Sequence, residues 1–291
     1  MHYQNDNYTI YIIIINEKKY NSNLKIYSQV LFKNIKEKVV INMSEKKLWN
    51  LLKDLQSPKY KWVDLTHEFG EDTPRWPGFK PLGNKILFDF DNAPMKVNEF
   101  TFPGQYGTHV DVPGHFVKGG RLVDEIDVSE FAYPLCVIDA SKKVAENVDY
   151  ALTVQDILDW EETHGKIPEG AFVALRTDWS KRWSSQDESL NIGEDEISHY
   201  PGWHIDALEF LFKERNIGAV GHETFDTDPP ALESQVPFKG EHYVLAQDKF
   251  QIEVLSNLDA VPETGAIVFA TFPKIKNATG FPARVFAIYE V

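Results

Sequence analysis

The sequence predicts a mixed α/β fold, of the α+β kind, in a single domain. Predicted strands and helices follow one another without the regular strand–helix–strand order that indicates a doubly wound parallel sheet. Hydrophobic residues make up 43% of the 291 residues and aromatic residues 13%, which is enough to bury a sizeable core. Neither an internal repeat nor a low-complexity linker divides residues 44–291. We therefore predict one domain over residues 43–291.

The first 42 residues differ from the rest of the chain. They contain six lysines and three acidic residues, and they lack glycine and proline. Their apolar run, residues 8–15, is shorter than the roughly 20 residues that span a bilayer, and it lacks the flanking pattern of a secretory signal. We predict that residues 1–42 are an N-terminal extension outside the fold. The alternative is an extra edge strand over residues 10–15.

The elements of the domain follow from apolar periodicity. A first helix is expected to begin at Ser44 as its N-cap. Apolar positions three and four residues apart predict helices over residues 153–160, with Thr153 as N-cap, and over residues 205–215. Alternating patterns and short apolar runs predict strands. These strands cover residues 86–90, 96–102, 135–140, 171–176, 217–221, 266–272 and 283–289.

Charge and cysteine content argue against several classes of protein. The chain has 44 acidic and 30 basic residues and a formal net charge of -14, which disfavours binding to nucleic acid or to an anionic membrane surface. The one cysteine, Cys136, rules out an internal disulfide and a CxxC motif, and its apolar surroundings are typical of a core. The sequence contains no GxSxG motif, which disfavours a serine hydrolase. We expect a cytoplasmic protein that binds a small molecule, with neither nucleic acid nor membrane as partner.

Metal-binding side chains concentrate in residues 105–116. If this segment is extended, His109 and Asp111 project to the same face and can bind one ion. A Pro-Gly turn follows and can bring His115 back over that face, and Gln105 lies four residues before the first histidine. Imidazole and carboxylate together suit Zn²⁺, Mn²⁺ or Fe²⁺. The alternative is a polar surface loop held by hydrogen bonds.

The motif Gly107-Thr108-His109-x-Asp111-x-Pro113-x-His115-Phe116 resembles the signature of the cyclase family of metal-dependent hydrolases. That family includes bacterial kynurenine formamidase, isatin hydrolase and trans-dienelactone hydrolase. The resemblance covers most of residues 62–291. It implies a mixed α/β domain with a swivelling β/β/α core, in a homo-oligomer such as a dimer or tetramer. The further matching stretches are residues 63–67, 76–78, 200–202, 223–229 and 241–255.

The chain departs from the formamidase pattern at one position. Formamidases of the family begin the signature with histidine, whereas this chain has Gln105 there. The amide oxygen of glutamine is a neutral and harder ligand than imidazole. The departure is similar to the dienelactone-hydrolase-like branch, in which glutamine is expected.

The resemblance also implies roles for individual residues. His109, Asp111 and Gln105 would bind the metal, and the family completes the site with a histidine or acid followed twelve residues later by a glutamate. We assign these positions to His242 and Glu253, and Glu241, which has the twelve-residue spacing, is the substitute for His242. His115 would be the general base. Trp76 and Phe116 would form an apolar wall against a ring-bearing substrate, or would be core residues.

The predicted function is therefore hydrolysis of an amide, lactam or lactone, with water activated by Mn²⁺ or Zn²⁺ and by a histidine base. The substrate is expected to be dienelactone-like or arylformamide-like. The alternative is a catalytically silent metal-containing protein that binds a small molecule. A pure binder would have no need of His115, which favours the enzyme.

Overall fold

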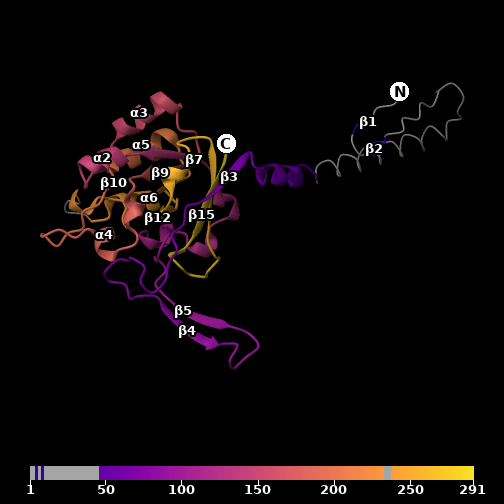
Figure 1. The fold of residues 1–291 in the computed structure, drawn as a ribbon. Helices are drawn as coiled ribbons and strands as arrows, with labels where there is room; N and C mark the ends of the chain where they lie inside the picture. The colour runs from indigo at the N-terminus through magenta and orange to yellow at the C-terminus, as the bar shows by residue number, and fades with distance from the viewer. Residues whose placement is uncertain (1–3, 6–7, 10–45, 233–236) are drawn as a thin grey trace, which may run out of the picture. The chain divides into compact units, whose positions relative to one another are not determined.

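The computed structural model describes residues 4–5, 8–9, 46–232 and 237–291 (Figure 1). The chain divides into two compact units, residues 1–57 and 58–291. In the first unit, β1 (Gln4–Asn5) pairs antiparallel with β2 (Tyr8–Thr9), and residues 46–55 are helical. The predicted N-cap Ser44 and the alternative strand over residues 10–15 lie outside the described residues. That residues 1–42 are an extension stays a prediction.

The second unit is built on a nine-stranded mixed sheet. Its central strands β7, β9, β11 and β12 pair in parallel, and the flanking strands pair antiparallel. This mixture confirms the predicted mixed α/β class. In sheet order the strands are β14 (Gly280–Pro282), β6 (His109–Asp111), β12 (Gln251–Glu253), β11 (Ala219–His222), β9 (Phe172–Arg176), β7 (Ala132–Asp139), β13 (Ala266–Thr271), β15 (Arg284–Glu290) and β3 (Tyr60–Asp64).

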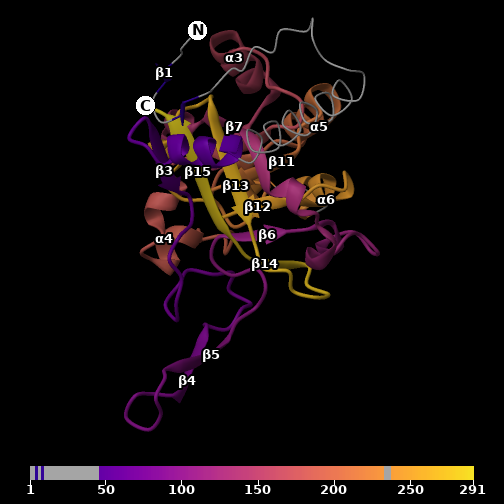
Figure 2. The same ribbon diagram turned by 90° about the vertical axis from the view of Figure 1, so that its right-hand side faces the viewer.

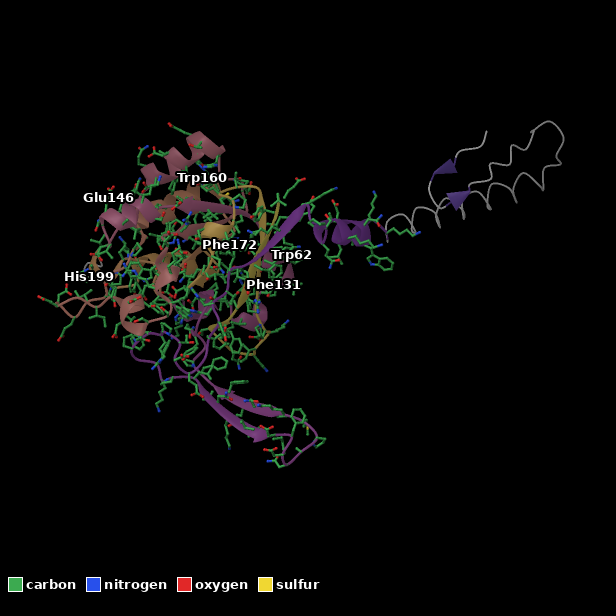
Figure 3. The ribbon with its side chains drawn as sticks, viewed as in Figure 1. Trp62, Phe131, Glu146, Trp160, Phe172 and His199 are labelled. Atoms are coloured by element: carbon green, nitrogen blue, oxygen red, sulfur yellow. The ribbon has the colours of Figure 1, made fainter. Side chains whose placement is uncertain are left out.

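Both faces of this sheet are buried, because alternate residues of the central strands enter two different hydrophobic clusters. Val137 and Phe172 belong to one cluster, whereas Cys136, Ile138 and Val173 belong to the other. Cys136 is 1% exposed, and burial raises the pKa of its thiol to about 11, so its assignment to the core is confirmed. In Figure 3, Phe172 lies inside the molecule, whereas His199 and Glu146 lie at its edge.

Helices α3, α5 and α6 contribute apolar residues to the second cluster and cover that face of the sheet (Figure 2). The N-cap prediction for α3 is confirmed, because the Thr153 side chain accepts a hydrogen bond from the Asp156 amide. Helix α5 spans the predicted residues 205–215 and ends at Asn216 in a left-handed conformation. The helices are α2 (Ser141–Glu146), α3 (Val154–His164), α4 (Gln186–Leu190), α5 (Ile205–Arg215) and α6 (Lys239–Ala246), with short 3₁₀ helices η2 (Pro113–His115), η3 (Val123–Glu125), η4 (Val128–Phe131), η5 (Trp179–Arg182), η6 (Pro230–Leu232) and η7 (Leu258–Ala260). No helix among the described residues has the length and apolar character that a membrane span requires.

Two small sheets complete the second unit. Strand β8 (Ala151–Leu152) pairs in parallel with β10 (Gly202–Trp203). Strands β4 (Gly83–Phe88) and β5 (Val97–Thr101) form an antiparallel hairpin that projects from the nine-stranded sheet (Figures 1 and 2). Every residue of β4 is exposed, including Ile86 and Phe88, so the hairpin contributes no apolar surface of β4 to the core.

Candidate metal centre

Strand β6 carries two predicted ligands on one face. Val110 enters the apolar core, and its neighbours His109 and Asp111 point to the opposite face, as the alternation of a strand requires. The His109 Nε2 atom lies 3.2 Å from Asp111 Oδ2. Both side chains are almost fully buried, and the Gly107 carbonyl lies 2.8 Å from His109 Nδ1. The site-facing nitrogen of His109 is therefore Nε2.

Strand β12 brings Glu253 to the same place. Glu253 lies directly opposite His109 in the antiparallel pairing of β12 with β6. Its Oε2 atom is 3.4 Å from His109 Nε2, and the side chain is 5% exposed. His109, Asp111 and Glu253 thus form a buried group whose ligand atoms lie within 4.8 Å of one another.

The short helix η2 returns His115 to this group. Pro113 begins the helix, and the His115 Nε2 atom ends 3.8 Å from Asp111 Oδ1 and 3.8 Å from Glu241 Oε1. The His115 side chain is 31% exposed, far more than the three buried side chains beside it. The turn after β6 therefore brings His115 back over the face that carries His109 and Asp111, on the solvent side of the buried group.

Helix α6 separates the two neighbouring candidates at residues 241 and 242. Glu241 is 4% exposed and joins Asp111 and His115 in a second group of ligand atoms within 4.8 Å. His242 lies on the exposed side of the helix and in neither group. Consecutive helical residues point about 100° apart, so only one of the two can face the site. The substitute Glu241, rather than the favoured His242, occupies it.

Gln105 lies beside Asp111 and donates a 3.2 Å hydrogen bond from Nε2 to Asp111 Oδ1. This contact uses the amide nitrogen, whereas a metal ligand would be the amide oxygen. Gly280 of β14 leaves the room that both side chains need, because a Cβ there would lie 2.7 Å from Asp111 Oδ1. That Gln105 is a ligand stays a prediction.

The charged groups of the cluster shift one another's pKa values. Burial alone would lower the pKa of His109, but Asp111 and Glu253 outweigh it and raise that pKa well above its usual value. Burial would raise the pKa of Asp111, but His109, His115 and Gln105 lower it. Burial and the carboxylates of Glu253 and Asp111 raise the pKa of Glu241 well above its usual value.

The cluster forms the floor of a cavity of about 280 Å³. Trp76 and Phe116, the two predicted substrate-binding residues, both line it. Phe116 packs against Phe238 with ring centroids 5.7 Å apart, and Trp76 packs edge-on against Phe79 at 5.3 Å. The walls are therefore aromatic and the floor is charged, as in many sites for small ring compounds.

Comparison with known proteins identifies the family. The Cyclase family model matches residues 63–229, more than half of the chain. Isatin hydrolase of Roseibium aggregatum is 34% identical over 249 residues, which cover 80% of this chain and 94% of that protein. This chain belongs to the cyclase family. Kynurenine formamidase of Bacillus cereus, with 28% identity over 233 residues, matches 77% of this chain and 95% of its own length.

Solved structures agree with this family assignment. An isatin hydrolase bound to the product analogue thioisatinate has a TM-score of 0.79 at 31% identity and covers 85% of this chain and 99% of its own. Isatin hydrolase A from Labrenzia aggregata, bound to benzyl benzoate, has a TM-score of 0.78 at 36% identity, with coverage of 84% and 99%. The predicted family, the mixed α/β fold of that family and the metal-dependent hydrolase class are thereby confirmed.

The residues of this cyclase-family site fit a divalent cation. His109 Nε2 is buried and has no hydrogen-bond partner among the described residues, although two carboxylates face it. A buried imidazole nitrogen with two nearby carboxyl groups is a ligand set that Mn²⁺ and Zn²⁺ both accept. Because the pKa values of His109 and Glu241 are raised, a cation that binds here would compete with protons.

Gln251 and Thr227, which sequence patterns did not reveal, and His222, which the pair His222-Glu223 suggests as a possible ligand, hold Glu253 in place. Gln251 Nε2 donates a 2.9 Å hydrogen bond to Glu253 Oε1, and Gln251 Oε1 accepts one of 2.8 Å from the Thr227 hydroxyl. His222, fully buried, has its Nε2 atom 3.4 Å from the same Glu253 oxygen. One oxygen of Glu253 is therefore bound to the protein, and the other faces His109.

Asp228 has the corresponding role for Glu241. Its carboxylate accepts hydrogen bonds from the amides of Gly240 and Glu241, at 2.7 and 3.3 Å, and so fixes the start of α6. A Cβ at Gly240 would lie 2.8 Å from the Asp228 carboxylate, so the glycine permits this close approach. The sequence placed Asp228 before two prolines but gave no sign of the helix that it holds.

Proposed function

We propose that this cyclase-family protein hydrolyses a ring-bearing amide, lactam or lactone, with a divalent cation held by His109, Asp111 and Glu253. The observation that carries the proposal is the buried group of one imidazole and carboxylates at the floor of an aromatic cavity. Glu241 replaces His242 in the proposed site, and Gln105 is the further candidate ligand. The similarity to isatin hydrolase and kynurenine formamidase, enzymes that act on carbonyl compounds, supports the same reaction class.

The burial of each side chain indicates its role in the proposed reaction. The cation, when bound, polarises the substrate carbonyl and makes water a better nucleophile. His115 is the exposed member of the cluster and lines the cavity, so its Nε2 atom can remove a proton from the attacking water. The same imidazole then gives that proton to the leaving nitrogen or oxygen. Trp76 and Phe116 would hold the ring of the substrate against the cavity wall.

The decisive experiment combines metal analysis with a substrate panel. Protein loaded with Mn²⁺ or Zn²⁺ is assayed with isatin, formylkynurenine and a dienelactone, and hydrolysis of at least one is expected. The His115→Ala variant should keep its metal and lose about 10²–10⁴-fold in turnover. Full turnover in that variant would refute the base assignment. Bound metal without hydrolysis across the panel would favour the silent binding protein.

A second arrangement of the same site is favoured by one observation. Asp111 belongs to both groups of ligand atoms, with His109 and Glu253 on one side and with His115 and Glu241 on the other. A bridging Asp111 could therefore hold two cations, in which case His115 would be a ligand rather than a base. Metal content per chain decides: about one ion supports the first arrangement and about two support the second. Elemental analysis, which measures the metal content, also shows whether the bound ion is Mn²⁺ or Zn²⁺.

We also propose that the chain forms a homo-oligomer, as a dimer or tetramer, through the β4–β5 hairpin. Ile86, Phe88 and Phe100 are each about half exposed on it, and a two-stranded hairpin is marginally stable alone in water. Sedimentation of the Phe88→Asp variant should show a smaller species than the parent chain. The control Lys85→Asp changes a polar residue of the same strand and should sediment as the parent does. A monomeric parent chain would refute the proposal.

A further inference from the structure

One residue of the cavity indicates that the substrate carries a charged substituent in addition to its ring and its scissile carbonyl. Arg75 lines it, next to Trp76 and Phe79 of the same loop. We propose that Arg75 binds an anionic group of the substrate, so that the substrate class is a ring compound bearing a carboxylate. This inference rests on the proposed hydrolase function and specifies its substrate.

No acid in the described part of the chain forms an ion pair with Arg75. Its Nε atom donates to the Phe79 carbonyl at 3.3 Å, and its Nη1 atom donates to the Thr73 carbonyl at 3.1 Å. Both acceptors are uncharged, and a guanidinium has five N–H groups, so donors remain for a ligand. Among the described residues, Arg75 forms no ion pair with a carboxylate, whereas four other arginines do. Those four are Arg121, Arg176, Arg215 and Arg284.

The loop that carries Arg75 is fixed before any ligand arrives. The Arg75 amide donates to Gln186 Oε1 at 2.9 Å, and Gln186 Nε2 donates back to the Arg75 carbonyl at 2.7 Å. The guanidinium joins both ends of the loop through Thr73 and Phe79. An arginine held in this way loses little side-chain freedom when it binds an anion.

The rest of the cavity makes a positive group necessary for such a substrate. Of the residues that the structure describes, four acidic ones line it: Asp111, Asp226, Glu241 and Glu253. An anionic substituent would be repelled by those that are ionised, and among the described lining residues Arg75 alone has a permanent positive charge. A planar guanidinium also matches the two oxygens of a carboxylate, while the neighbouring Trp76 offers a surface for the ring.

The test uses matched substrate pairs that differ by one carboxylate. Isatin is compared with isatin-5-carboxylate, and formanilide with 2-carboxyformanilide, for the parent chain, Arg75→Met and Arg75→Lys. The ratio of KM values, neutral over anionic, should fall at least about tenfold in Arg75→Met and by less in Arg75→Lys, which keeps the charge. The control Arg182→Met removes an arginine that lies 3.9 Å from the Trp179 ring and does not line the cavity, and it should leave the ratio as in the parent chain.

A purely structural role for Arg75 would change both members of a pair equally, and that result would overturn the proposal. Salt provides a test that needs no variant, because in the parent chain higher ionic strength should raise the KM of the anionic member alone. If metal-loaded protein hydrolyses neither member, the hydrolase proposal fails, and calorimetric Kd values of the same pairs test Arg75 independently. Equal Kd values for both members in the parent chain would then refute the anion site.

Discussion

The two halves of the metal centre are built from different structural material. His109, Asp111 and Glu253 stand on paired strands in fixed register and are almost fully buried. His115 and Glu241 come from a short 3₁₀ helix and from the first turn of α6, and His115 is 31% exposed. Paired strands hold the first three side chains in a fixed register, whereas His115 of the helical half stays open to solvent and Glu241 beside it is buried. The difference separates residues suited to bind a cation from the residue suited to exchange protons.

The largest effect should come from the residue that both halves share. Asp111→Asn removes a charge that faces His109 and His115 at once. We expect metal affinity to fall more than about 100-fold, beyond the range typical of supporting residues, and turnover to fall to background. Calorimetric titration with Mn²⁺ and Zn²⁺ measures the first effect. Unchanged affinity would show that the cation does not bind in this cluster.

A smaller effect is expected from the residue that orients the strand-borne half. Gln251→Met keeps the length of the side chain but removes the donor to Glu253 Oε1. Metal affinity should then fall about 10–100-fold. Thr227→Val removes the hydroxyl that donates to the Gln251 amide oxygen. It should also lower metal affinity, but by less than Gln251→Met does. Affinity equal to the parent in both variants would remove Gln251 from the site.

The pH dependence of stability should reveal the protonated cluster in metal-free protein. The folded state raises the pKa of Glu241 and of His109, so it binds more protons than the unfolded chain above about pH 4.5 and above about pH 6.5, respectively. The contribution of these two groups to the free energy of unfolding should therefore decline as pH rises through these values, whereas burial lowers the pKa of His67 to about 4 and gives a contribution of opposite sign below about pH 6.5. Denaturation of metal-free protein between pH 5 and 8 measures the slope. The Glu241→Gln variant should show a shallower slope, and an unchanged slope would contradict the assignment.

The smallest expected effect tests whether Glu241 or His242 of α6 faces the site. His242→Ala should change metal affinity less than twofold and stability by less than about 0.5 kcal/mol, because His242 is exposed and outside both groups. Glu241→Gln, at the adjacent position, is the matched comparison and should weaken metal binding. If instead His242→Ala lost the metal, helix α6 would have to turn its other face to the site.

The sequence could predict those features of the site that depend on neighbouring residues in the chain, and it could not predict those that depend on contacts between distant residues. His109 and Asp111 share a face because a strand alternates, and that rule needs no knowledge of the rest of the fold. The choice between Glu241 and His242 depends on the rotational setting of a helix, which Asp228 fixes through the amides of Gly240 and Glu241. A contact over twelve residues between a carboxylate and a helix start leaves no periodic pattern in the sequence. The family resemblance supplied Glu253, since nothing near it in the chain indicates a ligand.

Arg75 and Gln251 were missed for related reasons. An arginine in a loop is usually solvated, and only the cavity and the absence of a carboxylate partner among described residues single it out. Gln251 has a neutral amide, and its function appears only when β11 and β12 lie side by side and bring Thr227 within reach. The strands β7, β9 and β11 and the helices α3 and α5, in contrast, were predictable because burial imposes apolar periodicity on them.

The antiparallel register of β6 and β12 also limits how such a protein can diverge. A one-residue insertion in either strand would turn Ile252 or Val110 toward the cation and send a ligand into the apolar core. Insertions between residues 73 and 104 meet no such barrier, because that stretch contributes a cavity wall and a projecting hairpin but no member of the two ligand groups. We expect new substrate preferences to evolve there by changes in loop length, while the chemistry of the floor is inherited intact.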